Sequence, residues 1–381
     1  MSVTIIQQPS AISFAGNPVL LKAYSNLSEK TFLKVCAEVS VNVYRKSALI
    51  ESVVRRLSIP TQGGEKEVVF NLSDVLQSSL STVTIERSIP LAENWKPTDS
   101  SGHATYTVKL WDEFLDEYCE VVSTEQSLSV TTDRRTAIPG AYTDLQRLSA
   151  PEDTEAFLGE FRLLSDKPDF EAVPVKGSVM IPAFASGYDT KSVSLARPDG
   201  TVVLLGSVNF YASEISWPKV QLPEKWEEGI YSLWLSSNTD KPSRTVYVVP
   251  ETPFVTYFEF INGYGAVEGV YTFGRKTHKS KISQERQLMK FSNSFRPSTR
   301  YVKRILQKED NISLSTGPVS REWAKWFVST FFVAQKCWMY SKEADEMIPV
   351  VIECDEELEI FNESEASVVD IPFTVVKCLN V

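Results

Sequence analysis

The chain has 381 residues and a formal net charge of −10, which is long enough for two or three domains and disfavours general binding to nucleic acid. Hydrophobic residues make up 43% and charged residues 23%, a globular composition that excludes a disordered chain. The first residues lack a basic region followed by an apolar run, and no stretch has the ~20 apolar residues of a membrane helix. We therefore expect neither a signal peptide nor a membrane span.

Residues 1–132 predict a first β-sandwich domain. Apolar residues alternate with polar ones from Phe32 to Tyr44, which is typical of a strand with one buried face and one face towards water. Ser73 is positioned to cap a short helix. We expect a polar loop at 94–102 and further strands at 19–23, 51–59, 67–71, 106–111 and 127–131.

A charged segment ending in Pro139-Gly140 predicts the first domain boundary, and residues 140–250 predict a second, Ig-like β domain. Arg197-Pro198-Asp199-Gly200 predicts a turn, because proline presets one dihedral angle and glycine supplies a positive one. Segment 156–164 fits a short helix or an entering strand. Strands are expected at 177–184, 192–196, 202–205, 229–235 and 246–249.

Residues 253–381 predict a C-terminal α+β domain with one main helix, so the fold class is mainly β. Two aromatic runs around glycines between Tyr257 and Gly274 predict a hairpin. Ser320 can cap a helix over 320–335, whose aromatic residues recur at helical spacing, and a strand follows it. The aromatic face must pack on a sheet, because an isolated helix of this length is marginally stable.

Charge is polarised within this last domain. Residues 275–308 are strongly basic, and residues 353–365 are strongly acidic. The basic stretch is either a solvated sheet edge that discourages edge pairing or a docking surface for an acidic partner, such as the acidic segment of a neighbouring copy. Nucleic acid is a third hypothesis, because Phe291, Phe295 and Tyr301 interleave with the basic residues, but the acidic chain argues against it.

Head-to-tail self-assembly through the third domain is our expectation, with a homo-oligomer as one result. We expect aromatic anchors and basic charges to form the interface. The candidate interface residues are Tyr264, Tyr271, Arg300, Tyr301, Lys303 and Arg304.

Catalytic and metal-binding patterns are missing from the sequence. It contains only two histidines, and no phosphate loop, nucleophile elbow, zinc module or calcium loop occurs. The tryptophans Trp217, Trp226 and Trp234 form either sandwich core or a platform for stacking sugars. The sequence therefore predicts a protein that is not an enzyme and has no cofactor or metal.

The five cysteines are scattered and form no CxxC pair, which indicates reduced thiols and synthesis in a cytoplasm. Three segments carry a resemblance to a known group: ISFAGNPVLL from Ile12; IPGAYTDL with FLGEFRLLSDKP; and FEFINGYGAVEGVYTFG with TGPVSREWAKWFVSTFFVAQKCWMY. In this order they resemble tail-associated structural proteins of phages and prophages from Bacteroidetes-type bacteria.

That resemblance implies a non-enzymatic component of a virion or tail-like particle that is made in a bacterial cytoplasm, with other particle proteins as partners and no catalytic residues. The alternative hypothesis is a glycan-binding or adhesive β-domain protein of a gut-type bacterium. An enzyme is the third.

Overall fold

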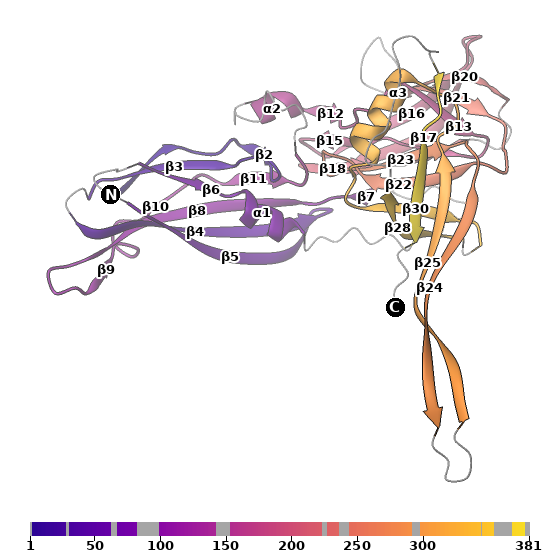
Figure 1. Ribbon diagram of the computed structural model, residues 1–381. Coiled ribbons are helices and arrows are strands. Elements are labelled where there is room, and N and C mark those ends of the chain that lie inside the picture. The colour runs from indigo at the N-terminus through magenta and orange to yellow at the C-terminus, as the bar shows by residue number, and fades with distance from the viewer. Residues whose placement is uncertain are drawn as a thin grey trace.

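The structure is a computed structural model that describes residues 2–27, 30–61, 67–81, 99–141, 153–222, 227–235, 244–291, 298–343, 345–353 and 368–377. For Thr31, residues 280–291, residues 298–310 and Val368 it describes the backbone alone. The chain is mainly β, as predicted, with several separate sheets (Figure 1). Within the described residues, no helix is long and apolar enough to cross a membrane.

The N-terminal part is a sandwich of a three-stranded and a seven-stranded sheet. The small sheet contains β1 (Val3–Gln7), β3 (Leu20–Ser25) and β6 (Glu67–Asn71). The large sheet has the order β2 (Ile12–Phe14), β11 (Arg135–Ile138), β8 (His103–Leu115), β4 (Thr31–Arg45) and β5 (Ala48–Pro60), while β9 (Val121–Ser123) and β10 (Val130–Thr131) also pair with β8.

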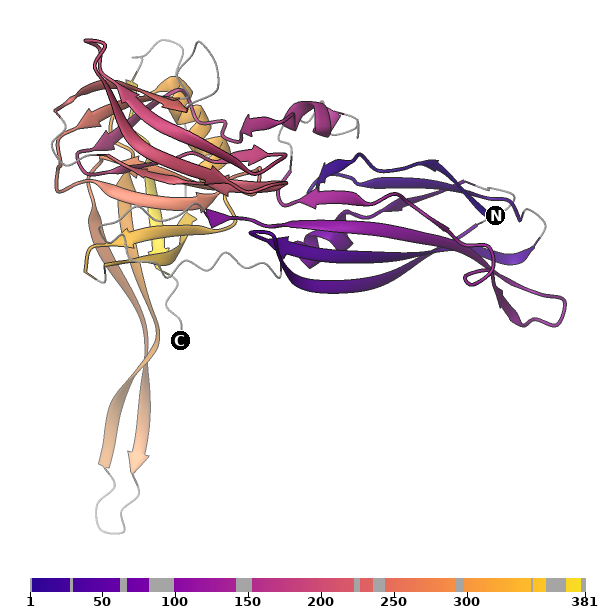
Figure 2. The same cartoon turned by 180° about the vertical axis from the view of Figure 1, so that it is seen from behind.

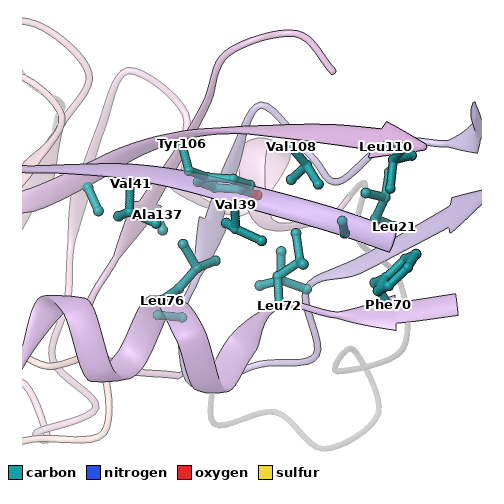
Figure 3. Close-up of a cluster of buried hydrophobic side chains, with 14 of the residues drawn as sticks. Leu21, Val39, Val41, Phe70, Leu72, Leu76, Tyr106, Val108, Leu110 and Ala137 are labelled. Atoms are coloured by element: carbon teal, nitrogen blue, oxygen red, sulfur yellow. The ribbon is translucent and has the colours of Figure 1, made fainter. Parts of the chain in front are cut away.

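The predicted alternation along β4 is confirmed, because Val35, Val39 and Val43 have no exposed surface, while Glu38, Ser40 and Asn42 are partly exposed. Figure 3 shows Leu76 of the helix α1 (Ser73–Leu80) lying near Val39 and Val41 of β4, and all of them belong to one core cluster. Burying such aliphatic side chains contributes roughly 1.5–3 kcal/mol each.

Two local predictions in this part are wrong. Ser73 is the first helical residue rather than the cap, and Asn71 Oδ1 accepts a hydrogen bond from the Ser73 N–H at 3.2 Å. The strand expected at 127–131 is reduced to Val130–Thr131, because the Leu128 N–H bonds to the Thr124 carbonyl in a turn.

The middle part contains a five-stranded sheet, a four-stranded sheet and a two-stranded sheet. Their orders are β13 (Phe170–Pro174), β21 (Arg244–Val249), β20 (Gly229–Leu235), β16 (Asp189–Ala196) and β17 (Val202–Phe210); β12 (Phe161–Leu163), β15 (Ala183–Ala185), β18 (Glu214–Trp217) and β7 (Asp99–Ser100); and β14 (Ser178–Met180) with β19 (Lys219–Gln221). Helix α2 (Asp153–Leu158) precedes β12, so segment 156–164 holds both a helix and a strand.

The predicted turn at 197–200 is confirmed by a positive φ of 85° at Gly200 and a hydrogen bond from its N–H to the Arg197 carbonyl. The loop expected at 94–102 lies partly outside the described residues, and Asp99–Ser100 forms strand β7 instead. Because β7 pairs with β18, a segment of residues 1–132 completes a sheet of the middle part.

The C-terminal sheet has seven strands in the order β23 (Val267–Thr272), β22 (Thr256–Ile261), β27 (Cys337–Ser341), β28 (Glu346–Glu353), β30 (Pro372–Lys377), β25 (Ser298–Ser315) and β24 (Thr277–Phe291). The predicted hairpin is confirmed as β22–β23, and the strand after the helix as β27. A short pair joins β26 (Val319–Ser320) to β29 (Val368–Val369).

The main helix is α3 (Arg321–Trp326), which continues as a π-helical turn, Phe327–Phe331. Ser320 caps it as predicted, since its side chain accepts from the Trp323 N–H. The helix is shorter than expected, because the Ala334 N–H bonds to the Phe331 carbonyl in a turn before β27. Phe327 and Phe331 are fully buried against Phe258 and Phe373 of the sheet.

The ranges 1–132, 140–250 and 253–381 remain predicted domains, but packing crosses both boundaries. The backbone at Gly140 has φ of 86° and lies against the turn of the β22–β23 hairpin, where an added Cβ would sit 2.1 Å from the Tyr264 carbonyl carbon. One core cluster joins Phe14, Trp217 and Val267 from the three parts. The close approach explains why glycine follows the proline here.

Candidate interaction site

The most prominent feature of the C-terminal part is a long two-stranded hairpin formed by β24 and β25, which we call the arm. It extends away from the body of the molecule in both views (Figures 1 and 2). β30 pairs with β25 only at residues 311–315, and in the described part of the chain β24 pairs with β25 alone. The outer stretch of the arm therefore has two unpaired edges.

Basic residues dominate the outer part of the arm. Between positions 286 and 304 the sequence contains no acidic residue, and its basic residues are Arg286, Lys290, Arg296, Arg300, Lys303 and Arg304. Register places Arg286 directly opposite Lys303, and Glu285 opposite Arg304. Like charges opposite one another destabilise a strand pair, and an isolated hairpin is marginal in water. The arm is therefore suited to a partner that supplies negative charge.

A basic cavity lies at the base of the arm. It has a volume of about 110 Å³ and is lined by Lys276, His278, Lys342 and Lys377, with Glu343 as the acidic residue among its lining groups. Burial lowers the pKa of Lys276, and the nearby positive charge of Lys377 lowers it further. The cavity therefore has an excess of positive charge, as the outer part of the arm does.

Four of the predicted interface residues, Arg300, Tyr301, Lys303 and Arg304, lie on β25 in the outer part of the arm. Register places Tyr301 opposite Leu288 and Arg300 opposite Met289. Basic and apolar residues thus share both faces of the arm. The acidic residues predicted to meet them, from Asp355 to Glu365, lie outside the described residues; Glu353 is the exposed last residue of β28.

The two remaining predicted anchors, Tyr264 and Tyr271, are buried inside the chain, and this corrects their assignment to an external interface. Tyr264 is 7% exposed and donates to Asp166 Oδ1 at 2.7 Å. Tyr271 is 8% exposed, and its hydroxyl accepts from the Ser178 N–H at 2.8 Å. Both rings join the C-terminal hairpin to the middle part, so they offer little surface to a neighbour.

A buried ionic cluster, which was not predicted from the sequence, joins the β22–β23 hairpin to the middle part. Lys167 pairs with Glu171 and donates to the Gly269 carbonyl at 2.8 Å. Arg244 lies 3.1 Å from Glu171 and 3.7 Å from Glu268. Burial lowers the pKa of Lys167, and Glu171 and Glu268 oppose that effect.

Two cations and two carboxylates balance in this cluster, so each buried charge has a partner of opposite sign. Removing one member would leave an uncompensated charge, which typically costs about 3–5 kcal/mol. The cluster therefore fixes the β22–β23 hairpin in position relative to the middle sheets. A sequence signal did exist: Glu259 and Glu268 stand in otherwise apolar strands, and Glu259 pairs with Lys219 at 3.1 Å.

A cavity of about 140 Å³ adjoins the ionic cluster. Lys167, Tyr271, Phe273 and Trp323 are among its lining residues. Ligand sites usually measure about 300–1,000 Å³, so this cavity suits at most a very small molecule. Lys167 is also fully engaged by its partners, which argues against an accessible amine nucleophile.

The tryptophans considered for sugar stacking are not brought together as one platform. Trp217 is 2% exposed and belongs to the core that joins the parts of the chain. Trp226 lies outside the described residues, and Trp234 is half-buried on β20. The core interpretation therefore holds for Trp217.

Within the described residues, no group of three or more His, Cys, Asp or Glu side chains is arranged to hold a metal ion. His278 is exposed near the base of the arm. His103 Nδ1 lies 3.4 Å from the buried carboxylate of Glu214, and the Ser100 hydroxyl donates a hydrogen bond to that carboxylate. This second polar cluster lies where β7 and β8 of the N-terminal part meet β18.

No protein-family model matches the sequence, and no curated protein matches it. Two similar solved structures are crystal structures of CBD12 from CALX1.2 and of the calcium binding domain CBD12 of CALX1.1. The first is 10% identical, has a TM-score of 0.20, and the match covers 64% of this chain and 97% of that one. The second is 9% identical, has a TM-score of 0.19, and the match covers 66% and 100%. Likenesses this weak say nothing about function.

Proposed function

We propose that the chain is a non-enzymatic structural protein of a phage-tail-like or prophage-encoded particle, and that its arm docks on an acidic surface of a neighbouring subunit. The arm is the observation that carries the proposal. It is a strand pair of 15 and 18 residues, basic along its outer part and without a covering layer among the described residues. The type of particle is inferred from the resemblance of three sequence segments to tail-associated proteins.

Electrostatics and backbone geometry both support docking by the arm. Complementary charge steers encounter and fixes register, while the unpaired strand edges can add to a partner's sheet through main-chain hydrogen bonds. Ile312 and Leu314 at the base of the arm belong to the aromatic core under α3, so the arm is anchored to the body of the molecule at that end.

The glycan-binding alternative is less well supported, because Trp217 is buried and cannot stack on a sugar. A nucleic acid is a competing partner for a basic arm, but the net charge of −10 disfavours long-range attraction to phosphates.

The test is native mass spectrometry and light scattering on the full chain, alone and with the protein products of neighbouring genes, at low and high salt. We expect a complex that weakens with salt and is lost when Arg300, Lys303 and Arg304 are each changed to Glu. The matched control reverses three exposed basic residues elsewhere: Arg162, Lys176 and Lys336. Unchanged binding by the arm variant, or binding to single-stranded DNA in place of protein, would overturn the proposal.

A further inference from the structure

Among the described residues, another long strand with a free edge is β5, in the N-terminal part of the chain. This strand has 13 residues and forms the rim of the N-terminal sandwich in both views (Figures 1 and 2). Among the described residues it pairs only with β4, so the hydrogen-bonding groups along its other edge have no strand partner. Long free edges are templates for pairing with another chain.

The core-facing side of β5 is left incompletely covered. Glu51, Val53, Arg55, Leu57 and Ile59 lie opposite residues of β4 that are 0–1% exposed, yet all five remain partly or fully exposed. The hydrophobic core under β4 thus reaches β5, but no described element fully covers the core-facing side of β5. Elsewhere on β5, Leu49, Ile50 and Val54 are each 52–55% exposed, and Val54 lies opposite Ser40 on the outer face.

Two charges on this side of β5 have no partner among the described residues. Glu51 and Arg55 point to the same face but are four residues apart along an extended strand, a separation of about 13 Å. They cannot reach one another within one chain. They can meet across an antiparallel pair of identical strands.

From this pattern we propose that a second copy of the chain pairs with β5 in antiparallel register about a two-fold axis at Val53. In that register Glu51 of each copy lies opposite Arg55 of the other, and the two Val53 residues face each other. A two-fold axis makes the interface self-complementary, so both charge pairs form at once. The two large sheets then join into one continuous sheet.

Neighbouring registers do not have this property. An axis at Arg55 places the two arginines opposite each other, and like charges directly opposite are destabilising. An axis at Val54 places Glu51 opposite Leu57 and leaves both charges unpaired. Arg56 does not compete for the new contact, because it is already paired on the outer face with Glu38 at 2.9 Å and with Glu125 at 3.2 Å. The β5 surface is separate from the arm and does not depend on the function proposed for it.

A cross-linking experiment tests the axis directly. Directly opposed residues in an antiparallel pair have Cα atoms about 4.5–5.5 Å apart, which suits a disulfide. In a Cys119→Ser/Cys354→Ser/Cys378→Ser background, which removes the thiol that is exposed among the described residues and the two cysteines outside them, Val53→Cys should give a disulfide-linked dimer under mild oxidation. The control Ser58→Cys lies five residues from the axis and should stay unlinked. Equal cross-linking of both variants, or of neither, would refute the register.

Charge swapping on the native cysteine background tests the pairing. In sedimentation equilibrium over a range of concentrations, Glu51→Arg and Arg55→Glu should each weaken dimerisation at least roughly tenfold, because each creates two like-charge contacts. The double variant Glu51→Arg/Arg55→Glu should restore it, while Glu67→Arg on the exposed end of β6 should have no effect. A monomer at all concentrations, or a dimer indifferent to the single reversals, would overturn the proposal.

Discussion

Strands β4 and β24 have the same length, 15 residues, and each is joined by a hairpin to a long antiparallel partner. Their surroundings nevertheless differ completely. β4 lies inside a seven-stranded sheet and buries every second side chain, whereas β24 forms the edge of the C-terminal sheet and leaves the body of the molecule (Figure 1).

The difference shows what decides whether a long strand pair becomes core or appendage. Alternating valines give β4 a continuous apolar face, which the small sheet and α1 cover. The sequence of β24, THKSKISQERQLMKF, has no such face, and its partner strand is rich in arginine and lysine. Charged residues along β24 and β25 disfavour burial of the arm. In contrast, one charged residue on β8, the strand next to β4, is buried in the core.

The largest expected effect lies in the core at the base of the arm. Phe327 is fully buried, with its ring 4.5 Å from that of Phe331, so Phe327→Ala should reduce the free energy of unfolding by ~3–5 kcal/mol. Phe291→Ala at the outer end of β24 should change it by less than about 0.5 kcal/mol. Urea unfolding followed by tryptophan fluorescence compares the two. Similar losses would mean that the arm is part of the cooperative core.

The buried charged residue is Asp112 on β8, opposite Val35 of β4. It has no exposed surface, and burial raises the pKa of its carboxyl to about 6, with the hydroxyls of Ser25 and Ser2 offsetting only part of the shift. The folded protein therefore binds a proton more tightly than the unfolded chain, so stability should fall as the pH rises from about 4 to about 6.

Asp112→Asn removes this charge and should raise stability at pH 8 by up to about 2–3 kcal/mol relative to the parent, while the two proteins should converge near pH 4. Chemical unfolding at a series of pH values measures the difference. The control is Asp133→Asn, a largely exposed carboxylate, which should follow the parent at every pH. A variant less stable than the parent at pH 8 would show that the carboxylate has a stabilising partner.

The smallest effect concerns the like-charge pair on the arm. Lys303→Glu places an acidic residue opposite Arg286 and should stabilise the hairpin by about 0.2–1 kcal/mol. Amide hydrogen exchange in β24 and β25 should slow, with global unfolding unchanged. The double variant Arg286→Glu/Lys303→Glu restores repulsion and should return exchange to the parent rate; slower exchange in both variants would contradict the pairing.

Sequence patterns alone were sufficient for the local elements of this protein. The two-residue alternation of β4, the aromatic runs of β22 and β23, the Ser320 cap and the turn at Gly200 each depend on residues close together in the chain, and their geometry follows from short-range sterics and hydrogen bonding. The polarity of the arm could likewise be seen as a basic stretch, although nothing in it predicted a projecting hairpin.

Tertiary structure decided the features that depend on which distant segments meet. Tyr264 and Tyr271 looked like surface anchors, but packing between the middle and C-terminal parts buries them. Lys167, Arg244 and Glu268 become one ionic cluster only because their segments converge. The proposed pairing of Glu51 with Arg55 of a second copy depends on the register with β4, which places both residues on one face of a free edge strand. Burial and register are properties of long-range pairing, and the residue pattern within a single segment does not contain them.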